Sequence, residues 1–65
     1  MTSYTVKATI TTEVGNAAAL QAFGGGGDEA SQIQAAVDAG LKELRGIAGR
    51  YGFTITDASA TVEPT

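Results

Sequence analysis

The fold of this chain is constrained most by one stretch of helical periodicity, residues 28–51, which lies between two stretches of strand-like sequence. Its small and apolar residues recur at steps of three and four, and on a helix they fall within a stripe about 120° wide. These residues are Ile33, Val37, Gly40, Leu41, Leu44, Ile47, Ala48 and Tyr51. The sequence therefore predicts one long helix with a single core-facing side.

Local signals mark both ends of this helix. Asp28 and Glu29 are adjacent at its start, where the helix dipole favours negative charge, so we interpret them as a cap rather than as a catalytic pair. Gly52 stands where a glycine commonly takes a left-handed conformation after the last turn, and the apolar Phe53 follows it. The helix is thus expected to stop at the sequence "RYGF".

Residues 3–14 alternate between two kinds of side chain, and this period of two predicts a half-buried strand. The inward set is Tyr4, Val6, Ala8, Ile10, Thr12 and Val14. Residues 53–62 predict a second strand, but its apolar residues change from odd to even positions between Ile55 and Ala58. We therefore expect a bulge or bend near residues 56–58. Between strand and helix, Asn16 is a good cap for a short helix over residues 17–22.

These elements form one β-α-β unit, in which the crossover should be right-handed. Two strands do not make a stable sheet by themselves. We therefore expect an α+β protein of one domain, residues 1–65, that is completed as a homodimer. Two copies related by a dyad would form a ferredoxin-like, four-stranded antiparallel sheet with two helices on one face.

The composition favours such self-association. A chain of 65 residues buries only about 60% of the surface that its unfolded form exposes, and Leu, Ile, Val and Phe together number only 13. Small domains often add disulfides or a metal, but Cys and His are both absent, which excludes disulfides and most zinc or copper sites. A second copy of the chain is the remaining source of burial.

The charge and the hydropathy exclude other partners. Four Lys and Arg residues against seven Asp and Glu residues give a net charge of −3, whereas nucleic acid or an anionic membrane would require a basic patch. No apolar run is long enough to span a membrane, and the N-terminal residues lack the features of a secretory signal. We expect the protein to reside in the cytoplasm of its producing cell or of a host.

Residues that could perform chemistry are scarce. The absence of His and Cys excludes the Ser-His and Cys-His nucleophile arrangements, and Ser31 and Ser59 have no base at a recognisable spacing. Asp38 and Lys42 are four residues apart and predict an ordinary surface pair. Oxygen ligands for Mg²⁺ or Ca²⁺ remain possible, although no loop of the calcium type is present. The sequence predicts no enzyme, no cofactor and no metal site.

Four consecutive glycines precede the long helix: Gly24, Gly25, Gly26 and Gly27. A phosphate-binding loop would need a Lys followed by Ser or Thr after the glycines, but Asp28 and Glu29 follow instead. We interpret this run as a flexible joint. Phe23 directly before it could move with the joint as a flap or extend across a dimer partner.

The long helix carries a second stripe, about 80° wide, on the side opposite the core stripe. Its residues are Ala35, Ala39, Lys42, Gly46 and Gly49. Small side chains there could let another helix approach closely, although an Ala- and Gly-rich composition places small residues everywhere. Gly in an exposed helix costs about 1 kcal/mol of stability relative to Ala, so this stripe is a candidate partner or oligomer contact. Phe23 is a second candidate contact. We expect Tyr4, Tyr51 and Phe53 to lie in the core.

From these features the sequence predicts a small, non-enzymatic, self-associating protein-interaction module. Such a module would be a regulator, an adaptor or a small structural component that binds itself and a further protein, and the composition is compatible with a phage or a GC-rich bacterial genome. The alternative is an oligomeric protein that binds a small molecule at the groove between sheet and helix or between dimer subunits. An enzyme that uses only carboxylates, Lys7 or Tyr hydroxyls is the least favoured class.

Overall fold

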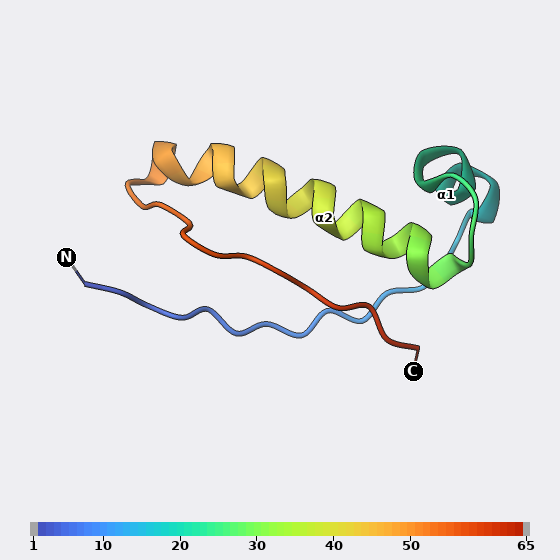
Figure 1. The fold of residues 1–65 in the computed structure, drawn as a ribbon, viewed down its shortest axis with the longest axis horizontal. Helices are drawn as coiled ribbons and strands as arrows, with labels where there is room; N and C mark the ends of the chain where they lie inside the picture. Colours follow the sequence, from blue (N-terminus) through green and yellow to red (C-terminus); the bar gives the residue numbers. More distant parts are fainter. Residues whose placement is uncertain (1, 65) are drawn as a thin grey trace.

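The computed structural model describes residues 2–64, and it contains two α-helices with extended chain on either side (Figure 1). Helix α1 spans Ala17–Gly24 and helix α2 spans Glu29–Ala48. A short 3₁₀ turn, η1, continues α2 over Gly49–Tyr51. The two helices predicted from the sequence are therefore both present, at nearly the predicted bounds.

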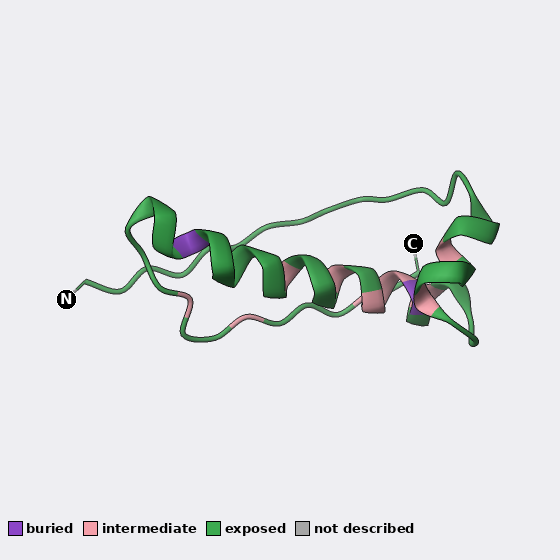
Figure 2. Ribbon diagram, turned by 90° about the horizontal axis from the view of Figure 1, so that it is seen from above, coloured by how far each residue is buried: buried purple, intermediate pink, exposed green. Residues whose placement is uncertain are grey.

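Helix α2 sets the long dimension of the molecule, which measures 43 × 23 × 17 Å. Helix α1 packs at the N-terminal end of α2, and both extended segments run along α2 in the direction opposite to it (Figure 1). Seen from above, α2 lies between the two segments over most of its length (Figure 2). The segments are thus roughly parallel to each other, and both lie on the same side of α2 in Figure 1.

Both helices begin at side chains that cap them. The Asn16 Oδ1 atom accepts a hydrogen bond of 3.0 Å from the backbone N–H of Ala19, and the Asp28 Oδ1 atom accepts one of 2.8 Å from the backbone N–H of Ser31. Each bond satisfies an N–H group that has no partner within the first helical turn. The predicted cap roles of Asn16 and Asp28 are confirmed.

The stop after α2 is also confirmed. Gly52 has a φ of 87° and a ψ of 21°, the left-handed conformation that favours glycine. The Phe53 N–H donates to the carbonyl of Ala48 at 3.2 Å, and the Gly52 N–H donates to that of Gly49 at 3.4 Å. This pair of bonds is the Schellman arrangement, which turns the chain back along the helix.

The predicted α+β, ferredoxin-like fold is wrong, because residues 2–64 contain no β-strand. Within the described chain, no backbone hydrogen bond joins residues 3–14 to residues 53–62. The period of two predicted an extended backbone, and the chain is extended there (Figure 1). A strand also needs a neighbour that bonds to its N–H and C=O groups, and the two segments lie apart in the view from above (Figure 2).

The bend predicted in the second segment is confirmed at Thr56. On either side of it, the half-covered side chains are Ile55 before the bend and Ala58 and Val62 after it. The change from odd to even positions requires the chain to rotate about its axis at this point. The apolar side chains on both sides of the bend can then lie toward α2.

Few side chains are buried in the described part of the chain. Only Ala48, which is 1% exposed, and Gln32, which is 5% exposed, are buried. Ile33, Val37 and Leu41 of the predicted core stripe are half-buried, and its remaining large side chains are exposed. The helix has the predicted apolar side, but no sheet lies against it.

Three aromatic side chains that the sequence placed in the core are also exposed. The prediction that Tyr4, Tyr51 and Phe53 lie in the core is wrong, since these side chains are 87%, 77% and 51% exposed. Each belongs to an extended segment or to η1, where the chain has no second layer to bury it against. The apolar side chains of one copy are therefore only partly buried.

Candidate interaction surface

The largest exposed apolar feature lies on the segment before α1. We name it the apolar row, and it consists of Tyr4, Val6, Ile10 and Val14. These residues occupy even positions in an extended segment, so they share one side of it. Val6 is 89% exposed, Ile10 is 78% exposed and Val14 is 40% exposed. The row is open at its N-terminal end and becomes covered as the chain approaches the helices.

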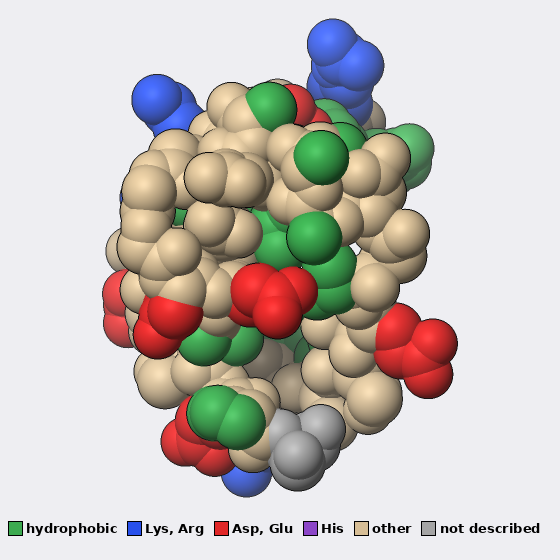
Figure 3. All heavy atoms as spheres, turned by 90° about the vertical axis from the view of Figure 1, so that its right-hand side faces the viewer, with side chains coloured by type: hydrophobic (Ala, Val, Ile, Leu, Met, Phe, Trp, Pro, Cys, Tyr) green, Lys and Arg blue, Asp and Glu red, His purple; other side chains and the backbone are tan. Residues whose placement is uncertain are grey.

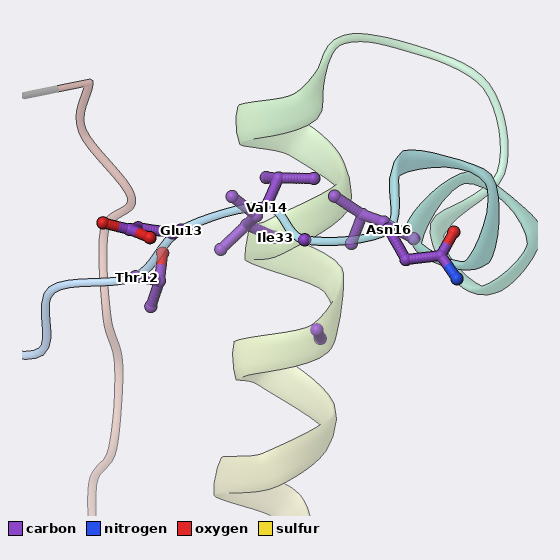
Figure 4. Close-up of a pocket in the computed structure, with 8 residues that line it drawn as sticks. Thr12, Glu13, Val14, Asn16 and Ile33 are labelled. Atoms are coloured by element: carbon purple, nitrogen blue, oxygen red, sulfur yellow. The ribbon is translucent and has the colours of Figure 1, made fainter.

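The covered end of the row is part of a small cavity. Val14 lines it together with Leu20 of α1 and Ile33 of α2 (Figure 4). The cavity has a volume of about 190 Å³. Ligand sites commonly occupy about 300 Å³ or more. This cavity therefore anchors the row to the helices and is too small to favour the small-molecule alternative.

A second cavity of about 340 Å³ lies between α2 and the segment after η1. Asp38, Lys42 and Arg45 line it, together with Leu41 and Ala58. One acidic and two basic side chains around a depression are typical of a solvated surface. The predicted pair of Asp38 with Lys42 is replaced by a hydrogen bond of 2.9 Å that Asp38 accepts from the Gln34 amide.

The predicted small-residue stripe of α2 is open to solvent. Ala39, Lys42, Gly46 and Gly49 are exposed, and Ala35 is half-buried. A Cβ atom added at Gly46 or Gly49 would meet no atom of the chain within 4 Å. The stripe is thus accessible, but small side chains alone do not identify what would bind there. Phe23 is 60% exposed and belongs to α1, so it is not part of this stripe.

The four glycines divide between a helix and a turn. Gly24 is the last residue of α1, and a Cβ atom added to it would lie 2.8 Å from the Cβ atom of Gln32. The Gln32 amide donates to the carbonyl of Gly25 at 3.0 Å and to that of Gly27 at 3.3 Å. The flexible joint stays a prediction, to which the structure adds a side chain that contacts the turn from the inside.

A second glutamine holds the segment that follows η1. The Gln34 Nε2 atom donates to the carbonyl of Ala60 at 2.8 Å, and its Oε1 atom accepts from the Val62 N–H at 3.0 Å. The side-chain amide thereby takes the place of a neighbouring strand for these two residues. Neither Gln32 nor Gln34 was singled out in the sequence, because a Gln beside an apolar stripe looks like any solvated helix residue.

Charged side chains lie at several places on the end of the molecule that carries α1 (Figure 3). The side-chain and backbone hydrogen bonds from Ser31 lower the pKa of Asp28 below its ordinary value. On the face in Figure 3, Lys and Arg side chains lie at the rim, and acidic and hydrophobic side chains mix across it. Within residues 2–64, neither helix is long and apolar enough to cross a membrane, and no three carboxylates lie close enough together to hold a metal ion.

No protein-family model, curated protein or solved structure matches this chain.

Proposed function

We propose that this protein is a non-enzymatic module that self-associates and acts through protein contacts. The exposed area is the observation that carries the proposal. The chain exposes 5749 Å². A compact folded chain of this mass would expose about 3,800 Å². Self-association would remove the excess from water.

The shape of the chain supports the same conclusion. Its radius of gyration is 14.0 Å. A compact domain of this length has a radius of gyration of about 11 Å. The difference comes from the extended segments, whose apolar side chains cover no core of their own. Burial against another copy would provide the apolar contact that one chain lacks.

The chemistry of the side chains supports a non-enzymatic role. The sequence has no His, the most frequent general base near neutral pH, and no Cys to serve as a nucleophile. Asp28 serves as a helix cap, and Asp38 accepts a hydrogen bond from Gln34. These carboxylates have structural partners, and they do not converge on a cleft.

Sedimentation equilibrium over a dilution series from millimolar to micromolar chain tests the proposal. We expect an average mass above that of one chain at high concentration, with a fall toward the single-chain mass on dilution. A mass equal to one chain throughout the series, together with a folded helical spectrum, would contradict self-association.

A further inference from the structure

We propose that two copies bind each other through the apolar row, with residues 6–14 of one copy antiparallel to the same residues of the other and Ile10 on the two-fold axis. This inference rests on the proposed self-association and names the surface that performs it. The occupant of the row is therefore a second copy of the chain.

The exposed area fits a second copy. The chain exposes about 1,900 Å² more than a compact chain of its mass. Two copies that removed this excess from water would bury about 3,800 Å² in total, within the range of obligate homodimers. The apolar row would contribute Tyr4, Val6 and Ile10 to such an interface, and these are the three most exposed large apolar side chains of residues 2–64.

The backbone of the segment is free to pair. Within residues 2–64, no backbone hydrogen bond involves the N–H or C=O groups of residues 3–14. An extended backbone with free N–H and C=O groups and an apolar side binds another extended segment readily. In a closed two-fold dimer, the same patch of each copy contacts its equivalent. The simplest such contact places the segment against itself in antiparallel orientation.

The side chains select the register of that contact. A two-fold axis at a residue position keeps the apolar sides of both copies on one face, whereas an axis between residues places them on opposite faces. Lys7 and Glu13 are the only charged side chains in residues 2–14. With the axis at Ile10, each Lys7 faces the partner's Glu13, and each Val6 faces the partner's Val14. Opposite charges that face each other stabilise a strand pair, and like charges destabilise it.

The contact uses one segment of each chain. The other extended segment stays on α2, because Gln34 already occupies the carbonyl of Ala60 and the N–H of Val62. The proposed dimer therefore does not restore the four-stranded sheet that the sequence predicted. It places two helical units on either side of one pair of extended segments.

A charge exchange tests the register. Lys7→Glu and Glu13→Lys each create two like-charge contacts per dimer, and we expect each to raise the dimer Kd about tenfold. The double variant Lys7→Glu with Glu13→Lys restores opposite charges, and its Kd should return to within about threefold of the native value. Arg50→Glu in η1 and Glu43→Lys on α2 change the net charge equally at exposed positions outside the segment, and they should leave the Kd nearly unchanged.

A cross-link tests the position of the axis. The native chain has no Cys, so Ile10→Cys introduces one thiol in each copy. Directly opposed residues of an antiparallel pair have Cα atoms about 4.5–5.5 Å apart, within reach of a disulfide. Mild oxidation should convert most of the Ile10→Cys chain to a covalent dimer and little of a Ser3→Cys control, whose thiols would lie far apart.

The outcomes separate the two proposals. A native chain that stays monomeric throughout the dilution series overturns self-association and this contact together. A native dimer that is indifferent to the single charge reversals, or that is not rescued by the double variant, overturns the contact and leaves self-association standing. Equal cross-linking of the Ile10→Cys and Ser3→Cys chains overturns the position of the axis. Residues 3–14 lie outside both helices, so the helical circular dichroism of the variants at Ser3, Lys7, Ile10 and Glu13 should match that of the native chain.

Discussion

Replacement of Gly24 by Ala should weaken the contact between α1 and α2. The added Cβ atom would lie 2.8 Å from the Cβ atom, 2.9 Å from the Cα atom and 3.0 Å from the Cγ atom of Gln32. The first two atoms are fixed to the backbone of α2, so a rotation of the Gln32 side chain cannot relieve the overlap. Helix α1 must therefore move away from α2, and the hydrogen bonds from Gln32 to the turn must lengthen.

The expected cost is large for so small a chain. Overpacking of one methyl group at a close contact costs about 1–3 kcal/mol. The free energy of unfolding of a 65-residue domain is about 3–10 kcal/mol in total. Gly24→Ala should thus remove a substantial share of the stability, although Ala has the higher helix propensity.

The neighbouring glycines provide matched controls. Gly26 has no atom of another residue within 4 Å of an added Cβ and has no positive φ, so Gly26→Ala should be neutral or stabilising by up to about 1 kcal/mol. Gly25 and Gly27 have φ values of 77° and 108°, so Ala there should cost about 1 kcal/mol through backbone strain alone.

Urea unfolding followed by circular dichroism, at one fixed chain concentration, measures all four variants. We expect Gly24→Ala to be the least stable and Gly26→Ala to be at least as stable as the native chain. Equal effects of Gly24→Ala and Gly26→Ala would refute the close approach of α1 to α2, and with it the arrangement of the helices.

Three further results are expected. The lowered pKa of Asp28 means that its contribution to stability is complete above its unfolded pKa and is lost as the pH falls through its folded pKa, so the native chain should exceed Asp28→Asn in stability at pH 7, and urea titrations should show this margin shrinking as the pH falls below the ordinary Asp pKa. Gln34→Ala should accelerate hydrogen exchange at the Val62 amide by NMR, whereas Gln21→Ala on the exposed side of α1 should not. Gly46→Ala should raise the melting midpoint through helix propensity, by about 1 kcal/mol of stability, and weaker self-association of this variant would instead show that α2 makes a close contact there.

The features that the sequence predicted correctly depend on near neighbours. Asn16 and Asp28 cap helices through amides three residues away, and the stop at Gly52 is made by bonds over three to five residues. The bend at Thr56 was predicted because the change of apolar phase is itself local. In each case the residues that make the interaction lie within a few positions of one another.

The features that it missed depend on distant partners. Alternation in residues 3–14 predicted the extended backbone and the side to be buried, but it could not specify which segment would lie alongside. Gln34 contacts residues 26 and 28 positions away in the sequence, a pairing that no spacing rule predicts. The same limit applies to Gln32, whose contacts with the glycine turn follow from the angle between α1 and α2.

The dependence of the melting midpoint on chain concentration tests the central claim, that a second copy covers the apolar surface of the first. The helical signal of α2 can be followed by circular dichroism over a dilution series at constant pH and salt. Because binding between folded chains stabilises them by mass action, the account predicts a midpoint that falls with each step of dilution. A cooperative transition whose midpoint is the same at every concentration would contradict it.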